Sequence, residues 1–217
     1  MSQPRIFPLG DAALVCEAPP PATLECQQRV WATAIAARDW AHVLEVVPGM
    51  NNLTLVFDPL EADADALAGQ LLAAWNAASA TDAPGRDVEI PVQYGGKFGP
   101  DLHAVAEHTG LTAREVVKRH AGGCYVVFFI GFQPGFAYMG GLDAALHTPR
   151  RASPRFEVPV GSVGIGGEQT GIYPAVSPGG WQLIGRTEVQ LFDPARRPPT
   201  LLQPGDRVRF TIAGMHA

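Results

Sequence analysis

The stretch YVVFFIGFQPGFAYMGG, residues 125–141, decides the class of the C-terminal part of the chain. Its apolar run at 125–130 has the length of one strand, and a Gln-Pro-Gly turn sequence follows at 133–135. Further strand-like pieces, separated by segments rich in glycine and proline, lie at 157–160, 188–192 and 207–212. Short strands joined by such turns, with no amphipathic helix between them, predict a closed or nearly closed β-barrel.

The N-terminal part alternates strands with helices. Strand-like segments at 14–16, 42–47, 52–57 and 88–92 are interleaved with helical segments at 21–37 and 61–78. The order β-α-β-β-α-β is that of the split, ferredoxin-like arrangement. We therefore predict an α+β fold, with a ferredoxin-like N-terminal domain over residues 1–92 and a helical connector and β-barrel domain over residues 93–217.

The connector carries start and stop signals for two helices. Pro100 suits the first position of one helix, and Gly110 suits its end. Thr112 and Glu115 have the spacing of a capping box, so a second helix should begin there and stop at the glycine pair 122–123.

Composition and charge exclude several functions. The chain has 217 residues, 47% of them hydrophobic, and a net charge of −5. The acidic excess lies in the first 80 residues, and the slight basic excess after residue 120 is far below that of a nucleic-acid-binding surface. No leader sequence and no apolar run of membrane-spanning length is visible, so we expect a cytoplasmic protein that binds neither nucleic acid nor membrane. The three cysteines lack C-x-x-C spacing and are expected to be reduced thiols.

The common nucleotide-binding and catalytic motifs do not match. The glycine-rich segment at 161–167 is followed by Glu-Gln, which fits neither a dinucleotide fingerprint nor a Walker A loop. We expect its glycines to form tight corners of the barrel, or a loop whose backbone amides approach a ligand. Neither Ser162 nor Ser177 lies in a G-x-S-x-G motif. His103 and His108 are off-face for a metal pair on a helix, so no metal is predicted.

Three groups of residues are candidates for a site or an interface. Phe132, Phe136 and Tyr138 lie in a glycine-rich loop, which either folds back onto the barrel or forms a ridge that docks a partner. The arginines at 150, 151 and 155 form either a solvated basic face or a guanidinium site for a carboxylate or phosphate. His120 ends a helix, where a cation stabilises the dipole, or it belongs to the site.

These residues also carry a family resemblance. The matching segments are FIGFQPGFAYMGGL at 129–142, TPR at 148–150, VPVGSVGIG at 158–166, QTGIYP at 169–174 and SPGGWQLIGRT at 177–187. In this order they are similar to the family of KipI and PxpB, the B subunit of 5-oxoprolinase, which is also called allophanate hydrolase subunit 1. The N-terminal region resembles the family more loosely.

The resemblance implies a ferredoxin-like domain followed by a cyclophilin-like β-barrel. It also implies two partners in a 5-oxoprolinase complex: a homologous larger protein of the KipA or C type, and a LamB/YcsF-type protein that supplies the A component. Together they would open 5-oxo-L-proline to L-glutamate with ATP and Mg, which we expect to bind in the assembled complex. The chain alone is expected to be inactive and to carry no prosthetic group. Two alternatives stay open: a KipI-like inhibitor of a histidine kinase, and subunit 1 of an allophanate hydrolase or urea carboxylase-type complex.

Within this family we assign roles to individual residues. The predicted catalytic residues are His120, Gln169 and Tyr173. The predicted ligands of the substrate carboxylate and the phosphates are Arg150, Arg155 and Arg186, and Arg155 is favoured because Pro154 stiffens its backbone. The predicted partner interface consists of Phe132, Phe136 and Tyr138.

Overall fold

The computed structural model describes residues 3–79 and 85–216. The chain forms two compact units, Met1–Ala83 and Pro84–Ala217. The boundary thus precedes the predicted one at residues 92 and 93. The reason is that strand β5 (Asp87–Gly95), expected in the first domain, pairs with β12 and β13 of the second unit.

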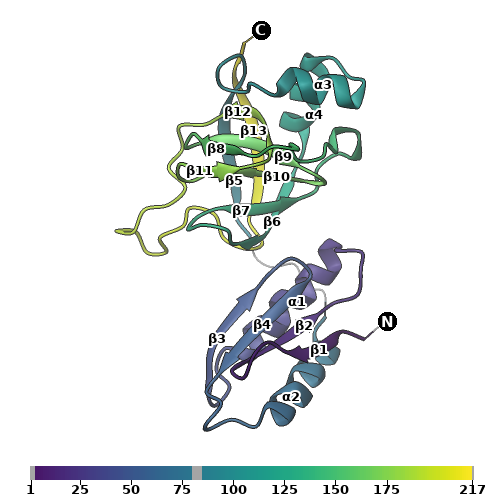
Figure 1. Ribbon diagram of the computed structural model, residues 1–217, viewed down its shortest axis with the longest axis vertical. Coiled ribbons are helices and arrows are strands. Elements are labelled where there is room, and N and C mark those ends of the chain that lie inside the picture. The colour runs from purple at the N-terminus through teal and green to yellow at the C-terminus, as the bar shows by residue number, and fades with distance from the viewer. Residues whose placement is uncertain (1–2, 80–84, 217) are drawn as a thin grey trace. The chain divides into compact units, whose positions relative to one another are not determined.

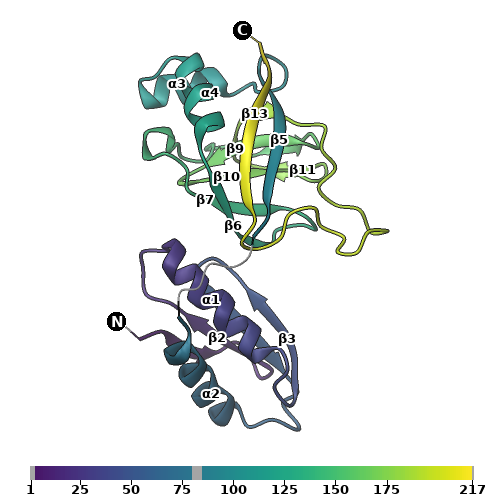
Figure 2. The ribbon, with the colours of Figure 1, turned by 180° about the vertical axis from the view of Figure 1, so that it is seen from behind.

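The first unit is a sheet with helices on one face. Its elements are β1 (Arg5–Pro8), β2 (Ala13–Glu17), α1 (Leu24–Ala37), β3 (Val43–Pro48), β4 (Asn52–Phe57) and α2 (Ala64–Ala77). The sheet is antiparallel, in the order β1-β2-β4-β3, and both helices lie on the same face of it (Figures 1 and 2). Alternate strand residues such as Leu14 and Leu55 therefore enter a core that includes Trp75 of α2.

The predicted β-α-β-β-α-β order is wrong in its last strand. The segment at 88–92 belongs to β5 in the barrel, and β1 occupies the edge of the sheet next to β2. Sequence analysis missed β1 because Arg5–Pro8 is short and contains a proline, which strands tolerate at edges. The ferredoxin-like arrangement as predicted is therefore not confirmed, although both helices were placed correctly to within a few residues.

The second unit is a closed β-barrel, as predicted. Within residues 85–216 its strands close in the order β10-β7-β6-β13-β5-β12-β9. Besides β5 they are β6 (Tyr125–Ile130), β7 (Ala137–Gly140), β9 (Ser162–Gly166), β10 (Gln169–Ile172), β12 (Gln182–Arg186) and β13 (Arg207–His216). A separate two-stranded sheet is formed by β8 (Arg155–Val158) and β11 (Ser177–Gly179). The finer description of the barrel as cyclophilin-like stays a prediction.

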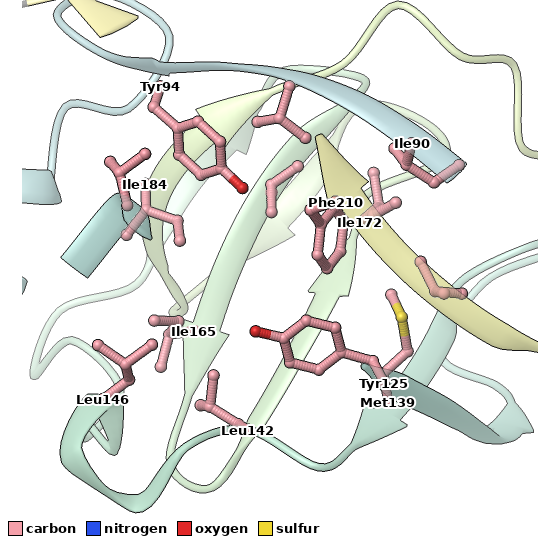
Figure 3. Close-up of a cluster of buried hydrophobic side chains, with 14 of the residues drawn as sticks. Ile90, Tyr94, Tyr125, Met139, Leu142, Leu146, Ile165, Ile172, Ile184 and Phe210 are labelled. Atoms are coloured by element: carbon pink, nitrogen blue, oxygen red, sulfur yellow. The ribbon is translucent and has the colours of Figure 1, made fainter. Parts of the chain in front are cut away.

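The interior of the barrel is filled by side chains (Figure 3). Tyr94, Tyr125 and Phe210 are buried there among aliphatic residues that include Ile165 and Ile184. Such a packed interior leaves no room for a ligand. A binding site must therefore lie on the outer surface or at an end of the barrel.

Helices α3 (Leu102–Thr109) and α4 (Ala113–Gly122) connect β5 to β6, and a short helix, η1 (Ala144–Leu146), follows β7. Gly110 caps α3 in the left-handed conformation, with a φ of 69°, and Thr112 forms the predicted capping box at the start of α4. The first helix begins after Asp101 and not at Pro100. Among the described residues, no helix has the length and apolar character needed to cross a membrane.

The strand predicted at 188–192 does not form. This segment lies in the long loop between β12 and β13, where a single bridge joins Phe192 to Thr200. The nearby strand is β12, immediately before it. Sequence reasoning missed β12 because its stretch QLIGR contains a central glycine, which weakens the strand signal.

The glycine-rich segment at 161–167 is mostly a strand. Gly161 and Gly167 have positive φ and do form corners at the ends of β9, as predicted. Gly164 and Gly166 instead lie within β9, where they give space to neighbouring side chains.

Candidate functional site

An aromatic cluster outside the barrel core brings together several of the predicted site residues. Phe136 is at its centre, with ring centroids 5.2 Å from Tyr173 and 5.5 Å from Trp181. Both contacts are edge-to-face, the arrangement that the quadrupoles of aromatic rings favour. Val158 and Leu183 complete the buried part of the cluster, which is distinct from the barrel core.

Glycines make this packing possible. A Cβ atom on Gly166 would lie 2.5 Å from the indole of Trp181, and one on Gly179 would lie 2.5 Å from the Tyr173 hydroxyl. Real Cβ atoms do not approach other atoms so closely. The glycines of the motif therefore bring backbone and aromatic ring into direct contact.

Phe132 and Tyr138 form the rim of the cluster. Phe132 is 61% exposed, and its ring touches both Phe136 and Tyr173. Its backbone has a φ of 64°, a conformation that is costly for a residue with a Cβ. Tyr138 is half-buried and stacks on Phe129 at 4.4 Å. An exposed phenylalanine held in a strained conformation is the feature of this rim most suited to contact with a partner.

Arg150 supplies a positive charge beside the cluster. Its guanidinium carbon lies 5.8 Å from the centroid of the Trp181 ring, and its side chain is exposed. Within residues 3–79 and 85–216 it forms no ion pair. A planar cation held over an aromatic ring and free of a carboxylate can bind a carboxylate or phosphate from solution.

The phenols near Arg150 stay protonated. Burial raises the pKa of Tyr173 above its usual value, against a hydrogen bond from the Trp181 backbone and the charge of Arg150. Burial likewise raises the pKa of Tyr138, and Arg150 opposes the rise. At neutral pH both groups can donate a hydrogen bond, for example to a carbonyl oxygen, but neither is available as a base.

Arg155 and Arg151 bind a carboxylate of the protein itself. Asp101 is 5% exposed and accepts hydrogen bonds from Arg155 at 2.6 Å and from Arg151 at 3.1 Å. Its other oxygen accepts the backbone N–H of Leu183 at 2.7 Å. The prediction that Arg155 binds the substrate is therefore not supported by its position, because an internal carboxylate already neutralises it.

Arg186 lies in a different place, a surface pocket of about 420 Å³. Its Nε donates to the carbonyl of Val160 at 2.8 Å. The pocket adjoins the aromatic cluster, because Pro174 lines it and follows Tyr173 in the chain. The predicted triplet of Arg150, Arg155 and Arg186 is thus separated into three environments.

His120 lies in the barrel core and not at the surface. Its Nδ1 is 2.8 Å from the Tyr94 hydroxyl, and its Nε2 is 2.9 Å from the hydroxyl of Thr170. The ring stacks on Phe210 and is fully buried. Burial lowers the pKa of His120 to about 3, so the interpretation as a cation at a helix end is wrong. The predicted catalytic role is not supported by this position either, because both ring nitrogens already have partners in the core.

Gln169 lies on the same face of the β9–β10 hairpin as Gly166 and Gly171, the two glycines that contact Trp181 of the aromatic cluster. It begins β10 and pairs with Gly166 across the β9–β10 hairpin, whereas Tyr173 follows the end of the same strand. At about 3.3 Å per residue, roughly 13 Å of strand separates them. Of the predicted catalytic residues, Tyr173 is buried in the cluster, Gln169 lies on the strand face next to Trp181, and His120 lies in the barrel core.

Sequence reasoning missed two residues that organise the site. Trp181 supports both Phe136 and Arg150, yet in the sequence it is a lone aromatic after two glycines. Asp101 has a detectable signal as an aspartate before a helix, but its partners lie 50 and 54 positions away. Nothing local in the sequence indicates such a pairing.

Known proteins resemble this chain over nearly its whole length. Residues 4–202 match the family model described as carboxyltransferase domain, subdomain C and D. A relative from Escherichia coli O157:H7, named as the B subunit of 5-oxoprolinase, is 51% identical over 210 residues, which cover 97% of this chain and 96% of the relative. A relative of the same name from Haemophilus influenzae is 50% identical over 211 residues, covering 97% of this chain and 99% of the relative.

A solved structure supports the fold. The crystal structure of TTHA0988 matches with a TM-score of 0.80 and 38% identity. The match covers 93% of this chain but 40% of that longer chain. Both the sequence relatives and the family model extend over the two units. The chain therefore belongs to the family of KipI and PxpB, the B subunit of 5-oxoprolinase.

Proposed function

We propose that the chain is the B subunit of a heteromeric, ATP-dependent 5-oxoprolinase. It would convert 5-oxo-L-proline to L-glutamate together with a larger homologue of the KipA type, the C-type partner, and a LamB/YcsF-type protein, the A-type partner. The observation that carries this proposal is the 51% identity, over 97% of the chain, to a protein named as the B subunit of 5-oxoprolinase. A relationship that spans both units at this level supports a shared role in a hydrolase complex.

Opening of a lactam with ATP requires a positively charged group and neutral hydrogen-bond donors at the site. A lactam carbonyl is a poor electrophile, and transfer of the ATP γ-phosphoryl group to the amide oxygen would make its carbon easier for water to attack. Substrate carboxylate and phosphates both require positive charge, and the lactam oxygen requires donors. Arg150 with the protonated Tyr138 and Tyr173 is the part of the aromatic cluster that fits these needs.

We assign ATP and Mg to the assembled complex. The sequence has no Walker A loop, and the described residues contain no group of three metal-ligating side chains. This chain's residues therefore do not fit a complete Mg–ATP site on their own. The C-type and A-type partners would complete it, and the chain alone would be inactive.

Reconstitution tests the proposal. The chain is purified from a host lacking its own homologues and assayed alone, with the C-type partner, and with both partners. We expect ATP hydrolysis dependent on 5-oxo-L-proline, with equimolar glutamate, only when all three proteins are present. Turnover by the single chain, or no turnover by the complete set, would overturn the proposal.

Arg150→Ala in the complete set tests the site within this function. We expect a loss of about 30-fold or more in kcat/KM, because the carboxylate or phosphate of the reactants would lose the guanidinium that pairs with it. Arg114→Ala, an exposed arginine on α4, is the matched control and should behave as the unchanged protein.

A second candidate function is carboxyl transfer within an allophanate hydrolase or urea carboxylase-type complex. The description of the matching family model, a carboxyltransferase domain, favours it. The two candidates separate in one assay, which offers urea with a carboxylated biotin carrier in place of 5-oxo-L-proline. Carboxyl transfer to urea without glutamate formation would favour the second candidate. No observation on this chain favours the inhibition of a histidine kinase, which stays a prediction.

A further inference from the structure

The contact between Arg150 and Trp181 does not by itself explain why the guanidinium stays over the ring. The Arg150 side chain is exposed, and its guanidinium carbon lies 5.8 Å from the ring centroid. At an exposed site a cation–π contact is weak, and it competes with the large rotamer entropy of an arginine side chain. The position of the guanidinium must therefore be set by the backbone that carries Arg150.

The residues on either side of Arg150 are bonded to the residues on either side of Trp181. The carbonyl of Pro149 accepts a hydrogen bond from Gln182 Nε2 at 3.0 Å. The first backbone N–H after Arg150 donates to the carbonyl of Gly180 at 2.7 Å. Because both neighbours of Arg150 are fixed in this way, its side chain starts from a point opposite the Trp181 ring.

A buried carboxylate, Asp101, joins this segment to the strand after Trp181. Its Oδ1 accepts hydrogen bonds from Arg155 Nη2 at 2.6 Å and from Arg151 Nη1 at 3.1 Å. Its Oδ2 accepts the Leu183 N–H at 2.7 Å, and the Asp101 N–H donates to the Leu183 carbonyl at 2.9 Å. The 150–155 segment and β12 are thereby held in one hydrogen-bonded frame.

Capping of a helix does not account for the aspartate at this position. Asp101 is the N-cap residue of α3, where an aspartate usually accepts a hydrogen bond from the first turn. Its side chain makes no such bond. The residue is 5% exposed, and its carboxylate faces the two arginines and the Leu183 backbone. The negative charge of Asp101 therefore serves the arginines.

We propose that Asp101 is a positioning residue for Arg150. By holding Arg151, Arg155 and Leu183 together, it keeps the Arg150 guanidinium over the aromatic cluster, with its charge free for an anion. Asparagine cannot replace it, because it has one acceptor oxygen where the frame uses two. The positioning rests on contacts within this chain, whereas its effect on kcat/KM rests on the proposed function.

NMR of the full-length chain tests the positioning without any partner. In the unchanged protein we expect nuclear Overhauser contacts between the Arg150 side chain and the Trp181 indole. Asp101→Asn should remove most of these contacts in a protein that stays folded, because Arg151 is released beside Arg150. If Asp101→Asn does not fold, Arg151→Ala replaces it, since it removes the link nearest to Arg150 and leaves Asp101 bonded to Arg155. The same loss of contacts is expected.

Asp206→Asn is the matched control. Asp206 is a carboxylate of the same unit, 2% exposed, that pairs with Arg86 at 2.6 Å and accepts the Gln203 N–H at 2.9 Å. Its substitution should also lower the free energy of unfolding, since it too leaves an arginine without its carboxylate. It should nevertheless keep the contacts between Arg150 and Trp181, which separates loss of positioning from loss of stability.

A double-mutant cycle in the complete set of three proteins tests whether Asp101 acts through Arg150. In the unchanged chain, Arg150→Ala should lower kcat/KM by about 30-fold or more. In the Asp101→Asn background, the same substitution should lower kcat/KM by less than about threefold, because the guanidinium is already displaced. Asp206→Asn should leave the full effect of Arg150→Ala in place.

Two results would overturn the positioning role. One is unchanged contacts between Arg150 and Trp181 in the folded Asp101 or Arg151 variant, and the other is a full loss from Arg150→Ala in the Asp101→Asn background. The NMR measurement does not depend on turnover, so it still decides the question if the complete set is inactive, a result that would refute only the proposed function. An active set in which the two substitutions are additive would refute only the role of Asp101.

Discussion

Asp101 determines which arginines of the 150–155 segment are available to a ligand. Because Arg155 donates to its nearly buried carboxylate at 2.6 Å, we expect Arg155→Ala to lower the free energy of unfolding by about 1–3 kcal/mol. The loss stays below that of a fully buried pair, because Arg151 and the Leu183 amide still contact Asp101. Urea denaturation measures it.

Arg150→Ala is the control for this substitution. Arg150 is exposed and has no carboxylate partner among the described residues, so its removal should change the free energy of unfolding by less than about 0.5 kcal/mol. In the reconstituted complex we expect the opposite ranking, with kcat/KM more sensitive to Arg150 than to Arg155. Equal stabilities of the two variants would contradict the role given to Asp101.

The buried His120 makes the free energy of unfolding depend on pH. Its pKa in the folded protein is lowered to about 3 by burial, against about 6.5 in an unfolded chain. Between these values the unfolded chain binds a proton that the folded chain excludes. The free energy of unfolding is therefore not reduced by His120 above about pH 6.5. As the pH falls from there towards 3, it decreases by up to about 1.4 kcal/mol per pH unit.

His120→Gln should flatten this part of the pH profile. Glutamine keeps polar atoms for Tyr94 and Thr170 but does not titrate, so the variant is less stable at about pH 8 and loses less stability between about pH 6.5 and 4. His103→Gln on the exposed face of α3 is the control and should keep the wild-type slope. Parallel slopes for all three proteins in urea titrations would show that His120 is not the group responsible.

At the scale of residues, the sequence shows which side chains are candidates for a site, but it does not show their burial or their partners. It marks Tyr173, Phe132 and Arg150 as candidates for three different roles, and only the structure shows that they lie in or beside one aromatic cluster. It does not separate Arg150 from Arg155, since the distinction depends on Asp101 far away in the chain. Nor does it place His120, whose burial follows only from closure of the barrel around it.

Strand β9 contains a glycine, Gly166, because the Trp181 ring packs directly against its backbone. We expect Gly166→Ala to lower the free energy of unfolding of the second unit by about 1–3 kcal/mol, because its methyl group would displace the Trp181 indole. The displacement should also loosen Phe136 and Tyr173, which pack around the same centre. Trp181 is the one tryptophan after residue 83, so near-ultraviolet circular dichroism combined with denaturation reports on it.

Gly122→Ala is the matched control for this element. Gly122 is the last residue of α4, and a Cβ there meets no atom within 4 Å, so the substitution should be neutral or slightly stabilising. If Gly166→Ala is as stable as Gly122→Ala and keeps the Trp181 signal, the close contact between β9 and Trp181 is not what the glycine provides.

At the scale of elements, long amphipathic segments were predictable and short glycine-containing strands were not. Helices α1 and α2 match the helical segments predicted at 21–37 and 61–78, and the structure adds their N-caps, Thr23 and Asp63. Strands β9, β10 and β12 were not predicted. Their side chains are largely buried, and their glycines interrupt the alternation of polar and apolar residues that indicates a strand. The wrong assignment of β5 has another cause: strand pairing is not encoded in a strand's own sequence.

At the scale of the whole molecule, two sites with different chemistry lie on the outside of one packed barrel. The cluster around Phe136 is aromatic with a cation at its edge, and the pocket of Arg186 is lined by carboxamides and aliphatic groups. They meet at residues 173–174, because Tyr173 belongs to the cluster and Pro174 lines the pocket.

The partner interface is best tested at Phe132 and not at Phe136. The sequence predicts that both contact the larger partner, but Phe136 is buried in its own cluster. Phe136→Asp should therefore unfold the second unit. Phe132 is exposed, and an aspartate tolerates its φ of 64° better than phenylalanine does. We expect Phe132→Asp to fold with unchanged or slightly higher stability, yet to bind the C-type partner about 30-fold or more weakly.

Affinity for the C-type partner and thermal stability must be measured on the same preparations. Leu60→Asp, which changes a 91% exposed apolar residue of the first unit, is the control and should bind as the unchanged protein does. Phe156→Asp, at a 97% exposed position of β8, then shows how far the interface extends along the two-stranded sheet. Because an exposed aromatic ring gains most of its binding energy from desolvation at a partner surface, loss of affinity without loss of stability is the signature of an interface. Wild-type affinity in a folded Phe132→Asp would place the contact with this partner elsewhere on the chain.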